Sequence, residues 1–113
     1  MARQAFLGEF EQMLLLAVLQ LDDQAYAPEI SRLLEQRASR QVSRGALYST
    51  LDRLEGKKLL RWTVEAASSE RAGNRKRRFE VTAKGVEALR SCREALFALW
   101  NGLDQVFARS TKS

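Results

Sequence analysis

Histidine is absent from the 113 residues of this chain, and cysteine occurs once, as Cys92. Histidine is the commonest general base and the commonest metal ligand, so its absence excludes a Ser-His-Asp triad, a Cys-His pair and a His-ligated zinc site. A single cysteine cannot form an intrachain disulfide, which is typical of a reducing compartment. The six glycines are scattered and form no phosphate-binding loop. We therefore expect no enzyme, no metal site and no cofactor.

Proline and long apolar stretches are also scarce. One proline and six glycines favour long regular elements over a loop-rich fold. The longest apolar run, Met13 to Leu19, is too short to cross a bilayer, which takes about 20 residues. Residues 1–5 lack the basic and then apolar order of a signal peptide. The sequence therefore predicts a cytoplasmic protein that does not associate with membranes.

Positive charge is in excess and is unevenly distributed. The chain has 19 Lys and Arg against 14 Asp and Glu, a net charge of +5. Basic residues gather in segments 40–58 and 70–78, whereas segment 9–35 leans acidic. Positive charge concentrated in two places is typical of a protein that binds a polyanion such as nucleic acid.

Hydrophobic periodicity predicts three helices in the first half of the chain. Residues 7–21 are apolar nearly all round, so a helix there should be covered on more than one side. Pro28 suits the first turn of a second helix, where its missing N–H costs nothing. Ser43 is placed to cap a third helix, which Gly56 should stop. Its buried stripe comprises Leu47, Leu51 and Leu54. This order of elements is that of a helix-turn-helix.

After the third helix the period of the pattern changes from 3.6 to 2. Residues 60–64 and 78–81 alternate between apolar and polar, which predicts two strands. The segment 65–76 between them is rich in Ala, Ser, Gly, Asn and Arg. A hairpin with a long basic tip, placed directly after a helix-turn-helix, predicts a wing.

A long final helix is predicted from Thr82, as its cap, to about Ala108. Apolar residues at alternating steps of three and four give it a heptad seam. At about 1.5 Å per residue this helix would be roughly 40 Å long, more than the preceding elements can cover. The excess apolar surface requires a second chain, so we expect a two-fold homodimer. The predicted dimer interface comprises Leu89, Cys92, Leu96, Leu99, Trp100, Leu103 and Val106.

Taken together, the pattern predicts a mainly α fold with a small β-hairpin. A winged helix-turn-helix DNA-binding domain is expected over residues 1–81 and a long C-terminal dimerisation helix over residues 82–113. Residues 43–55 (SRGALYSTLDRLE) closely resemble the third-helix signature of PadR-like transcriptional regulators. Residues 73–85 (GNRKRRFEVTAKG) resemble that family's wing and its entry into the last helix. The resemblance covers about residues 5–105.

Three positions depart from the family's pattern. Pro28 stands where the family often has glycine, and Phe79 stands where tyrosine is common. Lys58 occupies the position of the glycine that is usual late in the loop after the third helix. These are changes in turn and core positions, so the expected fold stays the same.

The resemblance implies a dimeric repressor of a pseudo-palindromic operator, with each third helix in a major groove of double-stranded DNA and each wing along the backbone or an adjacent minor groove. Several relatives release DNA when they bind a small molecule, so an effector is implied as well. Arg44 and Tyr48, one helical turn apart, are placed to reach bases or phosphates, and Ser43 and Ser49 suit phosphates. The predicted DNA-binding residues are Arg40, Ser43, Arg44, Tyr48, Ser49, Arg53, Arg75, Lys76 and Arg77.

Phe97 and Trp100 have two interpretations. The plainer one is that they pack the dimer seam as aromatic anchors. The other is an effector pocket between the paired helices, in which a planar aromatic small molecule stacks on Trp100 and its two-fold mate. Cys92 on the same seam is interpreted as a small packing residue.

A different function also remains open from the sequence. A winged helix can bind another protein after losing its contact with DNA. Such a module would have less reason to carry five cations within residues 71–78, which favours DNA.

Overall fold

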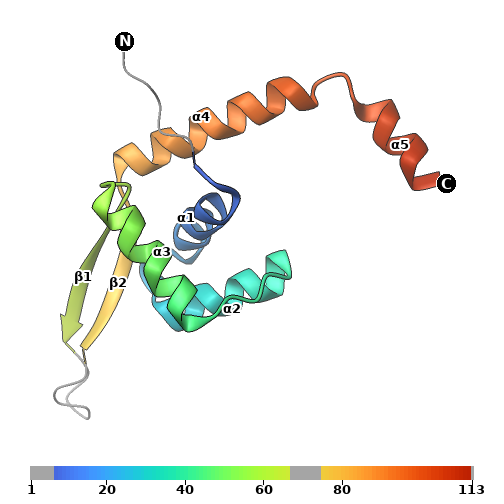
Figure 1. Ribbon diagram of the computed structural model, residues 1–113. Coiled ribbons are helices and arrows are strands. Elements are labelled where there is room, and N and C mark those ends of the chain that lie inside the picture. The colour runs from blue at the N-terminus through green and yellow to red at the C-terminus, as the bar shows by residue number, and fades with distance from the viewer. Residues whose placement is uncertain (1–6, 67–74, 113) are drawn as a thin grey trace.

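The computed structural model describes residues 7–66 and 75–112 of the chain (Figure 1). It confirms a mainly helical fold with one antiparallel hairpin and a long C-terminal helix. The elements are α1 (Glu9–Leu21), the 3-10 turn η1 (Asp22–Gln24), α2 (Ala27–Ala38), α3 (Arg44–Gly56), β1 (Leu60–Ala66), β2 (Arg75–Val81), α4 (Ala83–Trp100) and α5 (Asp104–Lys112).

Local side-chain chemistry begins the helices where the sequence predicts. The Ser43 hydroxyl accepts a hydrogen bond from the Ala46 N–H at 3.1 Å, which caps α3. The Thr82 hydroxyl likewise accepts from the Gly85 N–H at 3.0 Å and caps α4. Pro28 lies in the first turn of α2. These three helix starts are confirmed.

The end of α3 differs from the prediction. Gly56 is the last residue of the helix, and Lys58 takes the left-handed conformation that ends it, with φ 65°. The Lys58 N–H donates to the Glu55 carbonyl at 2.9 Å, and the Leu59 N–H donates to the Leu54 carbonyl at 3.0 Å. These two bonds are the Schellman pattern, which usually places glycine where Lys58 stands.

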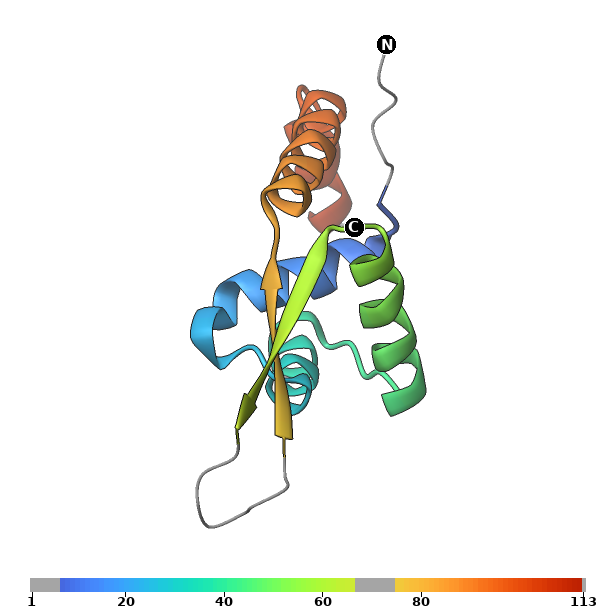
Figure 2. The same cartoon turned by 90° about the vertical axis from the view of Figure 1, so that its left-hand side faces the viewer.

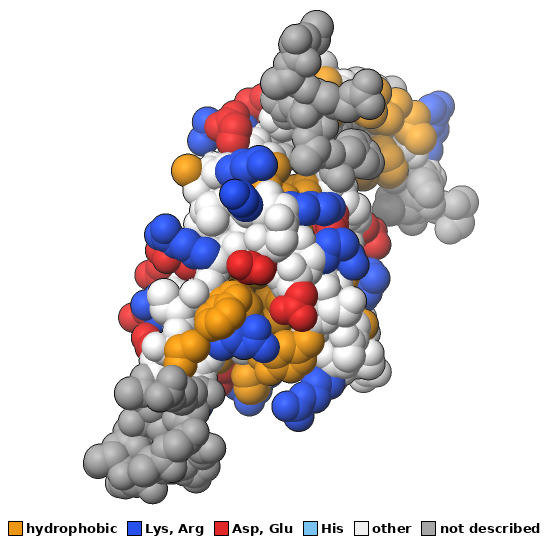
Figure 3. All heavy atoms as spheres, turned by 60° about the vertical axis from the view of Figure 1, so that its left-hand side comes forward, with side chains coloured by type: hydrophobic (Ala, Val, Ile, Leu, Met, Phe, Trp, Pro, Cys, Tyr) orange, Lys and Arg blue, Asp and Glu red, His pale blue; other side chains and the backbone are white. Residues whose placement is uncertain are grey.

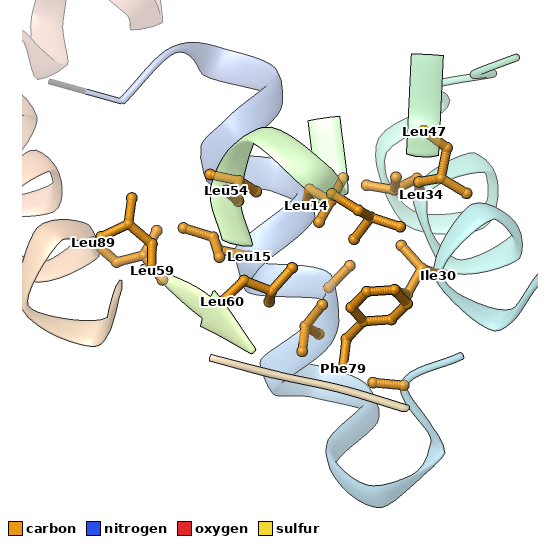
Figure 4. Close-up of a cluster of buried hydrophobic side chains, with 14 of the residues drawn as sticks. Leu14, Leu15, Ile30, Leu34, Leu47, Leu54, Leu59, Leu60, Phe79 and Leu89 are labelled. Carbon is orange, nitrogen blue, oxygen red and sulfur yellow. The ribbon is translucent and has the colours of Figure 1, made fainter. Parts of the chain in front are cut away.

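Helix α1 is at the centre of the fold, as its apolar composition predicts. Leu14, Leu15 and Val18 are buried, and α1 contacts α2, α3, α4 and β2. Figure 4 shows the leucines of α1 meeting side chains from both sides. The partners labelled there are Ile30, Leu34, Leu47, Leu54, Leu59, Leu60, Phe79 and Leu89. One hydrophobic core therefore joins the helix-turn-helix, the hairpin and the start of α4.

The hairpin strands are longer than the sequence predicts. They pair from Leu60 opposite Val81 to Ala66 opposite Arg75. Arg75 and Lys76, which the prediction placed in the tip, thus belong to β2, and residues 67–74 of the predicted tip lie outside the described part of the chain. The Phe79 N–H donates to the Ala25 carbonyl at 2.9 Å, which joins β2 to the turn after α1. Figure 2 shows the hairpin beside α3, in front of α1 and α2.

The predicted continuous helix from residue 82 to about 108 is wrong at its C-terminal end. Helix α4 ends at Trp100, and α5 begins at Asp104 after a turn in which Gly102 has φ +87°. Few residues except glycine adopt that conformation easily. The Asn101–Gly102 pair is a recognised turn signal, and the prediction rested on the heptad pattern alone. The ring centroids of Trp100 and Phe107 lie 4.8 Å apart across the turn.

Candidate nucleic-acid interface

The N-terminal end of α3, the start of α2 and strand β2 surround a shallow hollow of about 540 Å³. Figure 3 looks onto the face that carries the hairpin and α3, where basic side chains lie between hydrophobic ones. Arg44, Lys76 and Arg77 supply the positive charge of the hollow, and Glu29 is its acidic side chain. Its lining residues are Tyr26, Ala27, Pro28, Glu29, Arg44, Tyr48, Lys76, Arg77 and Phe79.

Helix α3 contributes the polar side chains that the sequence predicts. Ser43, Arg44 and Ser49 are exposed, although the Ser43 hydroxyl is also the cap of α3. Tyr48 is half-buried against the core, and the Arg44 guanidinium lies 5.7 Å from the centre of its ring. An exposed guanidinium beside a tyrosine ring at the start of a helix is well suited to contact phosphate or a base edge.

The two faces of β2 carry different contacts. The Arg77 guanidinium lies 5.0 Å from the Trp62 ring centre and 5.6 Å from that of Tyr48, so it faces α3. The Lys76 amine instead lies 5.4 Å from the ring centre of Tyr26. Arg75 pairs through its backbone with Ala66, and its side chain lies outside the described part.

Tyr26 belongs to this site although the sequence did not single it out. Its hydroxyl donates a hydrogen bond to Glu65, which also accepts from Arg78 Nε at 2.8 Å. The bond to Glu65 raises the pKa of Tyr26. The same bond, with that from Arg78, lowers the pKa of Glu65. Tyr26 and Glu65 are 39 positions apart, so no local pattern could have paired them.

Two predicted DNA-binding arginines are engaged with α1 instead of lining the hollow. Arg40 donates to Glu9 at 3.2 Å and lies 5.2 Å from the ring centre of Phe10. Arg53 donates through Nε to Glu11 at 3.1 Å. Their side chains are still 42% and 50% exposed, so both keep surface on the outside of the molecule.

Glu11 is the buried acid that receives Arg53. Its Oε2 accepts from Arg53 and from the Lys57 amine at 3.0 Å, and its Oε1 accepts from the Gly8 N–H at 3.0 Å. Burial by itself would raise the pKa of Glu11, but the hydrogen bonds from Gly8, Lys57 and Arg53 lower it below the usual carboxyl value. The charged carboxylate therefore ties α1 to the C-terminal half of α3.

The predicted dimer-interface residues fall into two groups. Leu89 and Cys92 are buried in the core of the chain itself. The others are exposed large side chains: Leu96, Leu99, Trp100, Leu103 and Val106. A hollow of about 510 Å³ lies between α1 and α4, and Leu16, Leu19, Phe97 and Trp100 are among its lining residues.

In the described ranges 7–66 and 75–112, no three or more acidic or cysteine side chains gather as metal ligands would. Within the same ranges no helix has the length and apolar character needed to span a membrane.

Three helices followed by a two-stranded wing, with basic side chains between the third helix and the wing, define a winged-helix regulator of transcription. The model of the transcriptional regulator PadR-like family matches residues 15–91. The chain belongs to this family. This membership confirms the resemblance noted in the sequence and the prediction that the chain is not an enzyme.

Solved structures agree with this assignment. A PadR-like transcription factor from Bacteroides fragilis is 26% identical, with TM-score 0.67 over 86% of this chain and 88% of that one. A PadR family regulator from Clostridium difficile R20291 is 21% identical, with TM-score 0.67 over 87% and 98%. A PadR-like regulator from Bacillus cereus is 24% identical, with TM-score 0.61 over 92% of both chains. The last two show the shared fold alone. Among curated proteins no match was found.

Proposed function

We propose that this PadR-family regulator is a homodimeric repressor that binds a pseudo-palindromic operator. The observation that carries the proposal is the position of Arg44 on α3 and Lys76 on β2 at one basic hollow. A third helix of this kind enters a major groove, and a wing follows the adjacent backbone. In a two-fold dimer the two α3 helices would read half-sites about 34 Å apart.

The side chains divide by role in this proposal. Arg44, Tyr48 and Ser49 on α3 read base edges or flanking phosphates, and Ser43 presents the start of α3 to a phosphate. Arg75 and Lys76 on β2 bind phosphates, which supplies affinity rather than sequence choice. Arg40, Arg53 and Arg77 add positive charge to the proposed DNA-binding domain while they contact partners within the chain.

The dimer is supported by apolar surface that one chain leaves exposed. Leu96 is 48% exposed, Leu99 74% and Trp100 52%. Exposed apolar surface of this kind on a helix end usually marks an interface. We assign DNA binding to residues 1–81 and dimerisation to residues 82–113, with Leu103 and Val106 of the last part completing the contact.

A planar aromatic molecule is the proposed effector. Phe97 and Trp100 border the hollow between α1 and α4, and aromatic side chains favour stacking with flat ligands. Saturation with a planar fluorescent compound should change the emission of Trp100. No change at saturation would remove the effector from the proposal but leave DNA binding untouched.

Fluorescence anisotropy with labelled duplexes tests DNA binding. The duplexes should cover the region upstream of the protein's own gene, and the titration should be repeated at several salt concentrations. A repressor should bind one duplex tightly, with log affinity falling against log salt by about 0.9 for each phosphate contacted. A folded dimer that binds no duplex even at low salt would refute the proposal and favour a protein-interaction module.

A further inference from the structure

Arg77 occupies a cage of aromatic rings between α3 and the wing. Its guanidinium carbon lies 5.0 Å from the ring centre of Trp62, 5.6 Å from that of Tyr48 and 5.9 Å from that of Phe79. A guanidinium within about 6 Å of a ring centre is attracted by the negative face of the ring. Three such rings, one each from α3, β1 and β2, lie around one cation of the chain.

The cage joins two elements that are proposed to contact DNA in different ways. Tyr48 belongs to α3, and so does Asp52, whose Oδ1 lies 3.9 Å from an Arg77 terminal nitrogen. Trp62 and Phe79 are opposite each other in the hairpin. Arg77 therefore links the proposed reading helix directly to the wing. Its side chain is partly exposed, whereas that of Phe79 is buried.

The opposite face of the hairpin is held separately. Arg78 and Tyr26 both bond Glu65 there, which fixes the wing to the turn before α2. The Arg77 side chain is 36% exposed, whereas Lys76 next to it is exposed and lies over a single ring. The two neighbouring cations therefore have different surroundings, and only Arg77 of the two contacts α3 in the described structure.

We infer that Arg77 is a positioning residue for operator recognition: its caged guanidinium sets the wing against α3, and it is not chiefly a phosphate ligand. This rests on the proposed DNA binding. The Arg77 guanidinium is planar, delocalised and weakly hydrated, so it stacks on aromatic faces, and a strongly hydrated lysine ammonium at the same position is not an equivalent replacement. Loss of the cage should let the wing move relative to α3, so that base and phosphate contacts no longer form together.

Salt dependence separates a positioning residue from a phosphate ligand. The wild type first selects a duplex from a random library, and its binding to that duplex and to a scrambled one is compared with that of R77K, R77M and K76M. K76M, the matched control, should lower the salt slope by about 0.9 and weaken both duplexes alike. R77K and R77M should keep the slope of the scrambled duplex and lose about tenfold in affinity for the selected one only.

R77K, which keeps the positive charge, distinguishes a positioning residue from a phosphate ligand. If Arg77 is a phosphate ligand, R77K should bind almost like the wild type and R77M should behave like K76M; either result would overturn the inference. Thermal unfolding of each variant should show that it is folded at the assay temperature. R77K answers the question even where R77M is unstable.

The free protein provides a readout that does not depend on DNA. In a Trp100→Phe background Trp62 is the remaining tryptophan. Its emission should change in R77K and R77M but not in K76M, because only Arg77 faces that ring in the described structure. If Trp62 emission in R77K, R77M and K76M is the same as in the parent Trp100→Phe protein, Arg77 does not lie against Trp62 in solution. That result would overturn the inference. If the wild type selects no duplex, the proposed function fails while this measurement still decides whether the cage is occupied.

Discussion

Glu11 and Arg53, 42 positions apart, join α1 to α3 through a hydrogen-bonded ion pair of 3.1 Å between Oε2 and Nε. The Glu11 side chain is only 9% exposed, and the half-exposed Lys57 amine completes the pairing. Glu11, in the first turn of α1, thus supports the helix that carries the proposed DNA-reading face.

Replacing Glu11 should weaken the fold. In Glu11→Gln the two cations lose their charged partner, and the Gly8 N–H loses a charged acceptor. We expect a loss of about 1–3 kcal/mol in the free energy of unfolding, measured by urea denaturation. Glu9→Gln is the control: its partner Arg40 and Glu9 itself are exposed, so the change should stay within about 0.5 kcal/mol. Equal losses in the two variants would contradict the structural role of Glu11.

The same carboxylate should make stability depend on acid pH. Because folding lowers the pKa of Glu11, the charged form stabilises the fold above the unfolded pKa of about 4.3. That contribution is lost as the pH falls through the folded pKa. Urea midpoints between pH 6 and pH 3 should therefore converge for the wild type and Glu11→Gln. A gap that stays constant over this range would exclude Glu11 as the titrating group.

Gly85 allows α4 to lie close to the loop after α3. A Cβ at this position would lie 2.3 Å from the Leu59 carbonyl oxygen and 2.7 Å from Val81 Cγ1. Gly85→Ala should therefore destabilise the protein by at least about 2 kcal/mol, as overpacking against backbone does. Gly45→Ala is the control, because an added Cβ there meets nothing within 4 Å, and stability should stay equal or rise by up to about 1 kcal/mol. Thermal unfolding distinguishes the two.

Lys58 holds a left-handed backbone, with φ 65°. Lys58→Gly should raise the free energy of unfolding by about 1 kcal/mol, because glycine adopts this conformation without the steric cost of a Cβ. Lys58→Ala removes the amine but keeps the Cβ, so it should show no gain. If alanine stabilises as much as glycine, the effect comes from the lost charge and not from the backbone.

The Tyr26 hydroxyl should lose its proton at a higher pH than an ordinary tyrosine does. The chain has two tyrosines, so an absorbance titration at alkaline pH can follow each one. We expect one group with a pKa above the ordinary value of about 10, absent in Tyr26→Phe and lowered in Glu65→Gln, because the Glu65 carboxylate accepts a hydrogen bond from the protonated phenol. The stability that this bond provides is present below the unfolded pKa and is lost as the pH rises through the folded one. An unchanged titration in Glu65→Gln would contradict the pairing.

Substitution of Leu99 tests the proposed homodimer. Its side chain is 74% exposed in one chain, so Leu99→Glu should leave the fold of that chain intact. In a two-fold dimer the same change would place charges on an apolar interface, and sedimentation should show monomers. Leu99→Met, which keeps an apolar side chain, should remain dimeric. A Leu99→Glu protein that still sediments as a dimer would remove α4 from the interface.

The elements themselves could be predicted because their signals are local. The caps at Ser43 and Thr82 bond to residues three positions away, and the buried stripe of α3 repeats every three or four residues. Each of these features is complete within a few turns of chain, so periodicity and capping chemistry are sufficient to predict it. The turn at Gly102 was equally local, but the prediction used the heptad spacing and not the Asn–Gly pair.

The site depended on contacts that only the folded chain makes. Arg77 and Lys76 are alike in sequence, but strand alternation and the docking of the hairpin place one in an aromatic cage and the other over Tyr26. Arg53 belongs to the polar face of α3 by pattern, yet a buried carboxylate on α1 receives it. By itself, the sequence determined the helices, the wing and the excess of positive charge, since these follow from neighbouring residues. Only the tertiary structure decided which cations pair with groups of the chain itself, because that depends on groups about 20 to 50 positions away coming within a few ångströms.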